Sequence, residues 1–275
     1  MKKMQILLFI CLFSVPFFCK TVFSASSGNA VLNKNKTVKN SNNIKTNKNL
    51  LLALDAAGKG DLKTVKYLIE QQNVDVNAVS GDGITILMKA CCNTNTDLVE
   101  YLLDNDANFF LKDKFGYTAL MYAIEKSDLI TVTYLFDEHY SDIQQQIDNQ
   151  MKFFLLALKN PDSRIIQYLI DVQQFDSSQV TDKGETLLML AAATGNMDTV
   201  KYLLNDAGLD ENQKDNNGDT VLMYAVKSKN LDLVQYLVET VGVSANETNN
   251  DGKKAFDIAV ADGQAEIAKY LLKYN

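Results

Sequence analysis

The sequence predicts an all-α fold, a solenoid of about seven stacked helix-turn-helix repeats, and three observations support it. A tyrosine followed by leucine recurs every 33 or 34 residues, and an alanine stands eleven residues before each of these tyrosines. Only two prolines occur in 275 residues, which favours helices over a β-sandwich or barrel. Repeats of this length bury their apolar faces by stacking on one another. The tyrosines are Tyr67, Tyr101, Tyr134, Tyr168, Tyr202, Tyr236 and Tyr270, and the alanines are Ala56, Ala90, Ala123, Ala157, Ala191, Ala225 and Ala259.

The first helix of a repeat is clearest in the third unit. Gly116 provides a turn conformation that residues with side chains resist. Thr118 follows and is expected to cap the helix by accepting a backbone N–H. Leu120 and Ala123 are three residues apart and so share one helical face. The small alanine methyl is expected to let a second helix approach closely.

The second helix of each repeat begins at a polar cap and carries an apolar stripe. In the third unit Asp128 is the predicted cap, and Leu129, Val132, Tyr134 and Leu135 form the stripe. Isolated helices of this length are marginal in water, so stacking must stabilise them. The equivalent predicted caps are Asp61, Asn95, Asp162, Asn196 and Asn230.

With this pattern the repeat resembles the ankyrin family, whose units of about 33 residues comprise a turn, two antiparallel helices and a projecting loop. The resemblance covers Asn49 to Asn275, and Asp75, Val76 and Asn77 are similar to the family's loop ending. We therefore expect the ankyrin-repeat domain to span 49–275. Four units carry the turn-and-helix motif as Gly83, Thr85, Leu87 and Ala90; Gly116, Thr118, Leu120 and Ala123; Gly184, Thr186, Leu188 and Ala191; and Gly218, Thr220, Leu222 and Ala225.

The chain departs from the family pattern at two places. The family's proline after the threonine and its histidine are replaced, the latter by Met88, Met121, Met189 and Met223, which we interpret as core residues. The fourth unit is degenerate, because Gln150 and Lys152 replace the glycine and threonine and Pro161 replaces a glycine. Its turn is therefore expected to differ.

The first 24 residues are predicted to be a secretory signal peptide. Lys2 and Lys3 precede an apolar run from Ile6 to Cys19, which is short for a membrane span. Small residues at 24–26 suit cleavage, so no membrane span is expected after processing. An uncleaved anchor and a lipid-modified Cys19 are the alternatives. Residues 25–48, rich in lysine and asparagine, are predicted to be a disordered linker. The expected location is periplasmic or secreted, and the composition suggests a bacterium.

Charge excludes nucleic acid as a partner. Removal of 1–24 takes away three lysines and lowers the formal net charge from −7 to −10. Five further lysines lie in residues 25–48 with no acid, which leaves −15 on the remainder. Such a body repels phosphate backbones and favours a basic protein partner. A monomer is expected.

No catalytic, cofactor or metal site is predicted. The sequence has one histidine, His139, and one arginine, Arg164. The two cysteines that follow the signal, Cys91 and Cys92, are adjacent and unsuited to pair with each other. No phosphate loop, nucleophile elbow or zinc-protease signature occurs. We therefore expect no enzyme activity.

The resemblance implies a function in protein–protein interaction. Ankyrin-like proteins grip partners with a concave side formed by loop tips and inner helices. The alternative is an envelope-associated structural scaffold, held by an uncleaved N-terminal helix or by the basic tail. The partner-binding positions carried over are Phe115, Tyr117, Glu125 and Lys126 in the third repeat, Asp182, Lys183 and Glu185 in the fifth, and Asn216, Asn217, Asp219 and Lys227 in the sixth.

Overall fold

The computed structural model describes residues 37–126, 128–146 and 150–274. The predicted signal peptide, 1–24, and the linker residues 25–36 lie outside this part of the chain. The chain divides into two units, Met1–Ser41 and Asn42–Asn275. Residues 37–48, which we expected to be linker, belong to a helix that runs from Thr37 to Gly58. That stretch contains no proline and no internal glycine, so nothing in its backbone stops the helix.

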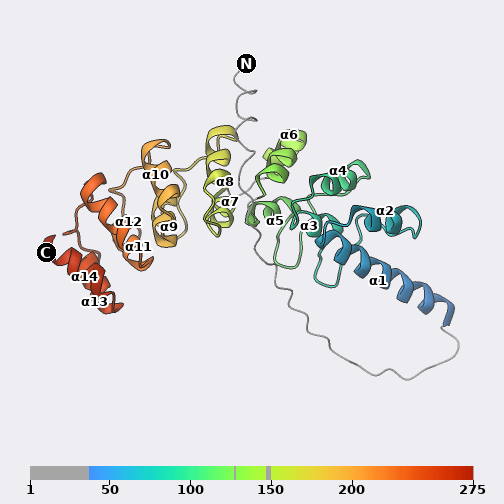
Figure 1. Cartoon of the computed structure of the whole chain (residues 1–275), viewed down its shortest axis with the longest axis horizontal. Coiled ribbons are helices and arrows are strands. Elements are labelled where there is room, and N and C mark those ends of the chain that lie inside the picture. The colour runs from blue at the N-terminus through green and yellow to red at the C-terminus, as the bar shows by residue number, and fades with distance from the viewer. Residues whose placement is uncertain (1–36, 127, 147–149, 275) are drawn as a thin grey trace, which may run out of the picture. The chain divides into compact units, whose positions relative to one another are not determined.

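The helices of the described residues form seven successive pairs (Figure 1). From α3 onward, each inner helix packs on the next inner helix along the chain. The all-α solenoid prediction is confirmed. The inner helices are α1 (Thr37–Gly58), α3 (Ile86–Ala90), α5 (Ala119–Glu125), α7 (Gln150–Ala157), α9 (Leu187–Thr194), α11 (Val221–Lys227) and α13 (Ala255–Ala261). The outer helices are α2 (Leu62–Glu70), α4 (Thr96–Asp104), α6 (Leu129–Gln146), α8 (Arg164–Gln167) continued by the π-helix η2 (Tyr168–Val172), α10 (Met197–Asn205), α12 (Leu231–Gln235) continued by the π-helix η3 (Tyr236–Val241), and α14 (Ala265–Leu271) ending in the 3-10 turn η4 (Leu272–Tyr274).

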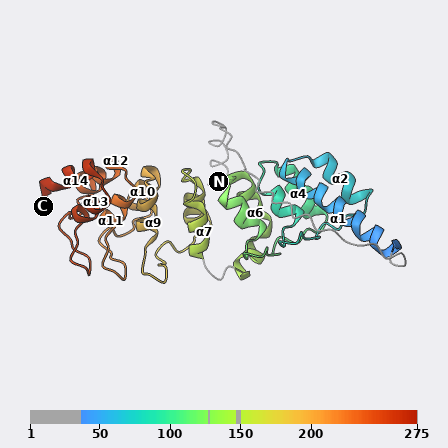
Figure 2. The ribbon, with the colours of Figure 1, turned by 90° about the horizontal axis from the view of Figure 1, so that it is seen from below.

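Long loops join the outer helices to the next inner helix everywhere except between α6 and α7, and we call them fingers, each numbered after the repeat that it precedes (Figure 2). Isolated antiparallel bridges close three of them, Val79–Thr85, Val180–Thr186 and Lys214–Thr220. The described residues contain no named strand. Fingers 2, 3, 5, 6 and 7 comprise residues 71–85, 105–118, 173–186, 206–220 and 242–254.

The alanine and leucine columns form the core, as predicted. All seven alanines and all seven leucines that follow the ladder tyrosines are buried, most of them completely. The four methionines are buried as well, which agrees with their interpretation as core residues. In two repeats the thioether sulfur also accepts a backbone hydrogen bond. The N–H groups of Thr85 and Thr220 donate to the Sδ atoms of Met88 and Met223 at 3.4 and 3.5 Å.

The tyrosine column is only partly buried, which corrects the expectation that it belongs wholly to an apolar stripe. Tyr67 is 55 % exposed, whereas Tyr202 and Tyr270 are buried, and the hydroxyls of Tyr101, Tyr202 and Tyr270 reach carboxylates of the preceding repeat. Tyr202 donates to Asp171 Oδ1 at 2.7 Å, and Tyr101 donates to Glu70 Oε1 at 3.1 Å. The hydroxyl needs a polar partner, so the ring is placed where a carboxylate can reach it. The column thus links repeats by hydrogen bonds rather than by apolar burial alone.

An asparagine row forms a second polar link between repeats. Asn230 Oδ1 accepts the Leu233 N–H at 3.1 Å and caps α12, while its Nδ2 donates to the Gly195 carbonyl of the preceding repeat at 2.9 Å. Asn196 caps α10 in the same way and donates to the Pro161 carbonyl at 2.6 Å. The equivalent contact therefore survives where proline replaces glycine. The predicted caps are confirmed at Asp61, Asn95, Asn196 and Asn230.

Repeat 4 is remodelled at its start. Helix α6 has 18 residues, whereas α4 and α10 have nine each, and α7 begins at Gln150. Only residues 147–149 remain to join α6 to α7. Three residues are too few for a finger of the length found before the other repeats, so the expected difference in the turn extends to the whole loop. The residues that join these helices lie outside the described part of the chain.

The tyrosine links can be tested by removing one hydroxyl. Burial, together with the bond to Asp171, raises the pKa of Tyr202 above its ordinary value. The neutral phenol is therefore the stabilised form, and its contribution is present below pH of about 10 and lost at higher pH. We expect Tyr202→Phe to lower the free energy of unfolding by about 1–2 kcal/mol at neutral pH, measured by urea denaturation.

Tyr236→Phe is the matched control, because the Tyr236 hydroxyl has only a marginal 3.5 Å contact with Asn205 Nδ2. We expect its effect to be smaller than that of Tyr202→Phe. Equal losses in the two variants would contradict the proposed role of the carboxylate.

The asparagine row fails in the last repeat, which gives a second test. Gln264 is the N-terminal cap of α14, but its side chain does not bond the helix, and both its amide oxygen and nitrogen are buried without a partner in the described structure. We expect Gln264→Asn to raise the free energy of unfolding by about 0.5–1 kcal/mol, because asparagine is the shorter and better cap. The reverse change, Asn230→Gln, at a position where asparagine does cap its helix, should lower the free energy of unfolding. Destabilisation by Gln264→Asn would refute this account.

Candidate interaction surface

The tip of each finger is shaped by a polar side chain that accepts two backbone N–H groups. In finger 3, Asp113 Oδ1 accepts the N–H groups of Phe115 and Tyr117, both at 2.8 Å. Tyr122 on α5 donates to Asp113 Oδ2 at 2.7 Å. Burial acts to raise the pKa of Asp113, but these hydrogen bonds outweigh it and hold the pKa below its ordinary value. The charged carboxylate therefore fixes the tip and ties it to the inner helix.

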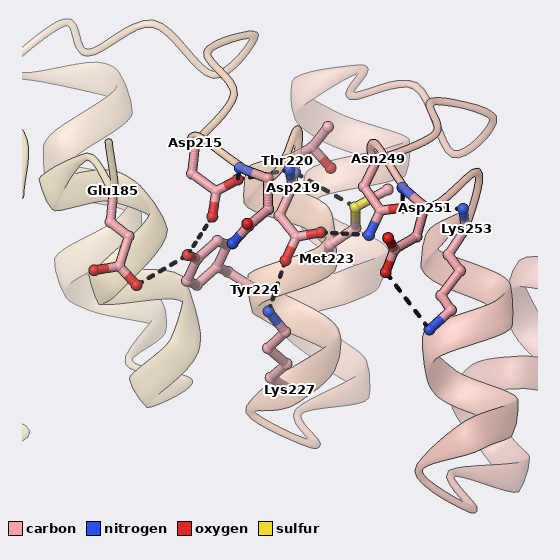
Figure 3. Close-up of polar contacts among 11 residues, drawn as sticks. Glu185, Asp215, Asp219, Thr220, Met223, Tyr224, Lys227, Asn249, Asp251 and Lys253 are labelled. Carbon is pink, nitrogen blue, oxygen red and sulfur yellow. Dashed lines mark hydrogen bonds and ion pairs between the residues drawn. The ribbon is translucent and has the colours of Figure 1, made fainter. Parts of the chain in front are cut away.

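Finger 6 repeats this arrangement (Figure 3). Asp215 Oδ1 accepts the N–H groups of Asn217 and Asp219 at 2.9 and 2.8 Å, and Tyr224 donates to Asp215 Oδ2 at 2.9 Å. Tyr224 also lies 3.0 Å from Glu185 of the preceding repeat. Burial and these two carboxylates raise the pKa of Tyr224. The phenol therefore joins finger 6 to finger 5.

In repeat 3 the structure places the predicted residues in different environments. Phe115 is 72 % exposed at the finger tip and is covered only by Lys114, whose Nζ lies 5.0 Å from the ring centre. Tyr117 is half-buried between two lysines of repeat 4. Glu125 pairs with Lys159 at 3.0 Å. Lys126 is exposed, and its ammonium has no hydrogen bond or ion pair in the described structure.

In repeat 5, two of the three predicted residues point into solvent. Asp182 and Lys183 are exposed, and their charged groups have no side-chain partner within the described residues. Glu185 is half-buried and accepts hydrogen bonds from Tyr224 and from Thr181, the latter at 2.9 Å. It is therefore held by the fold.

In repeat 6, the predicted residues divide in the same way. Asp219 is buried, and its carboxylate accepts from Asn249 at 2.7 Å and pairs with Lys227 at 2.9 Å (Figure 3). Asn216 donates to the Asp182 carbonyl at 3.1 Å. The Asn217 side chain is exposed and makes no hydrogen bond in the described structure. Asp219 and Asn216 thus link neighbouring repeats and Lys227 is paired within repeat 6, whereas Asn217 is available to a ligand.

A cluster in repeats 3 and 4 was not predicted as a unit. Lys152, Leu155 and Lys159 lie on one face of α7 and its end, since they are three and four residues apart. The Nζ atoms of Lys152 and Lys159 lie 5.3 and 5.8 Å from the centre of the Tyr117 ring, within cation–π range. We call Phe115, Tyr117, Lys152, Leu155 and Lys159 the repeat 3–4 patch. The degenerate start of repeat 4 was the signal that could have indicated it.

The residues considered for chemistry form no constellation in the described structure. Cys91 is buried, and burial raises the pKa of its thiol well above the ordinary value. Arg164 pairs with Asp162. The side chain of His139 lies outside the described part. Among the described residues, no group of three metal-binding side chains and no helix suited to crossing a membrane is found.

Comparison with known proteins agrees with this architecture. A family model described as ankyrin repeats (3 copies) matches residues 53–147, 153–249 and 207–275. The crystal structure of the human ASB11 ankyrin repeat domain superposes with a TM-score of 0.67 at 23 % identity, over 81 % of this chain and 97 % of that one. The likeness to this structure concerns the fold.

Two curated relatives are similar over a shorter stretch. The chain is 34 % identical over 96 residues to the serine/threonine-protein kinase TNNI3K of Rattus norvegicus and, to the same extent, to that of Mus musculus. The match covers 32 % of this chain and 11 % of each kinase, so the chain spans only a small part of their length. Because the family model covers nearly all of residues 53–275 and the helical pairs follow the same plan, this chain belongs to the ankyrin-repeat family.

Proposed function

We propose that this chain is an exported protein that binds another protein through its fingers and inner helices. One observation carries the proposal: four of the predicted contact residues, Lys126, Asp182, Lys183 and Asn217, are exposed with side chains that make no hydrogen bond or ion pair in the described structure. Polar side chains that the fold does not use are available to a partner at little cost in stability. Ankyrin repeats are an interaction module, which supports the same conclusion.

Charge supports a preference for basic proteins at long range. The acidic body attracts positive partners and accelerates their encounter. Of the predicted acidic contact residues in repeats 5 and 6, Asp182 is exposed, whereas Glu185 and Asp219 are committed to Tyr224 and Lys227. Long-range attraction therefore comes from the summed charge rather than from a dedicated acidic pocket.

Export is the second part of the proposal and rests on the N-terminal sequence. We expect the protein recovered outside the cytoplasm to begin at Ala25 or Ser27, as measured by the intact mass of the untagged chain. A chain that retains residue 1 and sediments with the membrane would instead favour the anchored envelope scaffold. Detection of the protein in the cytoplasm alone would refute export.

The binding face can be tested with residues that the fold leaves free. We expect the triple variant Lys126→Ala, Lys183→Ala and Asn217→Ala to weaken binding of a captured natural partner at least ten-fold, measured by titration calorimetry. Contacts at the centre of an interface cost more than about 1 kcal/mol when truncated. Melting temperature should stay unchanged, because these side chains contact nothing that stabilises the repeats.

A matched control lies on the outer helices. Lys63, Glu100 and Asp198 are also exposed, on α2, α4 and α10. Their replacement by alanine should leave affinity within about two-fold of the parent, the scatter expected of surface changes. If the control variant lost binding and the finger variant kept it, the partner would use the outer face and the proposal would be wrong.

A further inference from the structure

The fingers are joined in a row by one recurring backbone hydrogen bond. Each of these fingers has one glycine of positive φ at its tip, which we call the finger glycine. The backbone N–H of the residue two positions before it donates a hydrogen bond. The acceptor is the carbonyl of the residue directly before the finger glycine of the preceding finger. Lys114 donates in this way to Asp82, Asn216 to Lys183, and Asn250 to Asn217, each at 2.9 Å. Fingers 2 and 3 thus form one group, and fingers 5, 6 and 7 form another.

The row is interrupted at repeat 4. The carbonyl of Phe115 on finger 3 and the N–H of Asp182 on finger 5 occupy the positions that would bond a fourth finger, and neither has a hydrogen bond in the described structure. These two groups are therefore an unused acceptor and an unused donor on either side of the break.

The surroundings of the finger glycines show that finger 3 has space beside it. A Cβ atom on Gly83, Gly184 or Gly218 would meet backbone atoms of the next finger at 3.0 Å. A Cβ on Gly116 would meet nothing within 4 Å. Gly116 has a positive φ of 78°, as the other finger glycines do, so its backbone has the same conformation, and what differs is that no neighbouring finger is found among the described residues. Finger 3 is thus the exposed edge of its group.

The side chains around this edge combine apolar surface with positive charge. Phe115 is 72 % exposed and Leu155 is 40 % exposed. The Nζ of Lys152 lies 3.5 Å from the Gly116 carbonyl and beside the Tyr117 ring, so it is positioned at the edge. Lys159 is also held beside Tyr117, and its pairing with Glu125 is solvent-exposed and therefore weak. A positive aromatic patch of this kind stands apart from the acidic charge of the rest of the repeat domain.

We propose that the edge of finger 3 is a docking site for an extended, acidic segment of the partner protein. A backbone N–H of that segment bonds the Phe115 carbonyl, as a fourth finger would. A carboxylate of the segment pairs with Lys159, and an apolar side chain packs on Phe115 and Leu155. Main-chain hydrogen bonds to an open edge, with side chains providing specificity, are a recurrent mode of peptide recognition. This inference rests on the proposed function. It adds which kind of partner segment binds at one part of the proposed interaction surface.

The test is selection from random 12-residue peptides displayed on phage, using the full mature chain as bait. We expect the enriched peptides to carry net negative charge and at least one aromatic or aliphatic residue. Their affinity, measured with the synthetic peptides by fluorescence anisotropy, should fall at least ten-fold for Phe115→Ala and for Lys159→Glu. Val180→Ala is the matched control, since Val180 is 51 % exposed on finger 5, and it should leave affinity unchanged.

Each other outcome overturns the docking site. Enrichment of basic or uncharged peptides, or of acidic peptides that bind both patch variants normally, would place recognition elsewhere. If binding were lost only in the Lys126, Lys183 and Asn217 variant, the proposed function would stand and the docking site would fail. If the chain enriched no peptide but bound its natural partner, the docking site alone would fail. If the chain bound neither a peptide nor a natural partner, both the docking site and the proposed function would be contradicted.

Discussion

Close approach of successive helical pairs is the constraint on which the rest of this structure depends. An alanine stands at the point of closest packing in every repeat, and six of the seven have no exposed surface at all. A larger side chain there would separate the helices, and overpacking of a core costs about 1–3 kcal/mol. The leucine of the outer helix fills the space behind the alanine. Because each inner helix from α3 onward packs on the next, these repeats do not complete their cores without a neighbour, and stability is shared along the chain.

Apolar burial is non-directional, so it does not by itself fix how one repeat sits on the next. Three rows of polar contacts provide that register in this chain. Asparagine caps such as Asn230 donate to a carbonyl of the preceding repeat, tyrosines such as Tyr202 donate to a carboxylate there, and finger tips bond the preceding finger. Two of these rows are interrupted. The first lacks an amide donor at Asp128 and Asp162 and fails again at Gln264, whose side chain is one methylene longer than asparagine. The third breaks at repeat 4, where the connection between α6 and α7 is only three residues long.

The sequence was sufficient to predict the helical pairs, the alanine and leucine columns and most of the caps, since these depend on residue size and spacing within one repeat. It did not predict the polar contacts of the tyrosines, because periodicity identifies a column but does not say whether a hydroxyl finds a carboxylate 31 residues earlier. It also could not distinguish free from committed residues on the fingers. Asp219 and Asn217 are two residues apart and equally polar, yet one is buried against Lys227 and Asn249 while the other is exposed. That difference arises from contacts between repeats, which no single repeat encodes.

The degenerate repeat illustrates how loss of a structural motif can create a surface. A finger normally covers the edge of its predecessor and satisfies one of its carbonyls, so an ordinary repeat 4 would have hidden Gly116 and the Phe115 carbonyl. In this chain the connection is short, α7 brings Lys152 and Lys159 to Tyr117, and the edge keeps an unused acceptor among cationic and apolar side chains. Net charge does not predict what such an edge binds, because screening limits the distant acids to about a Debye length of 8 Å in physiological salt, whereas the lysines are in direct contact with the edge. On our proposals, the acidic body therefore governs which proteins approach, and the local chemistry of the edge governs which segment remains bound.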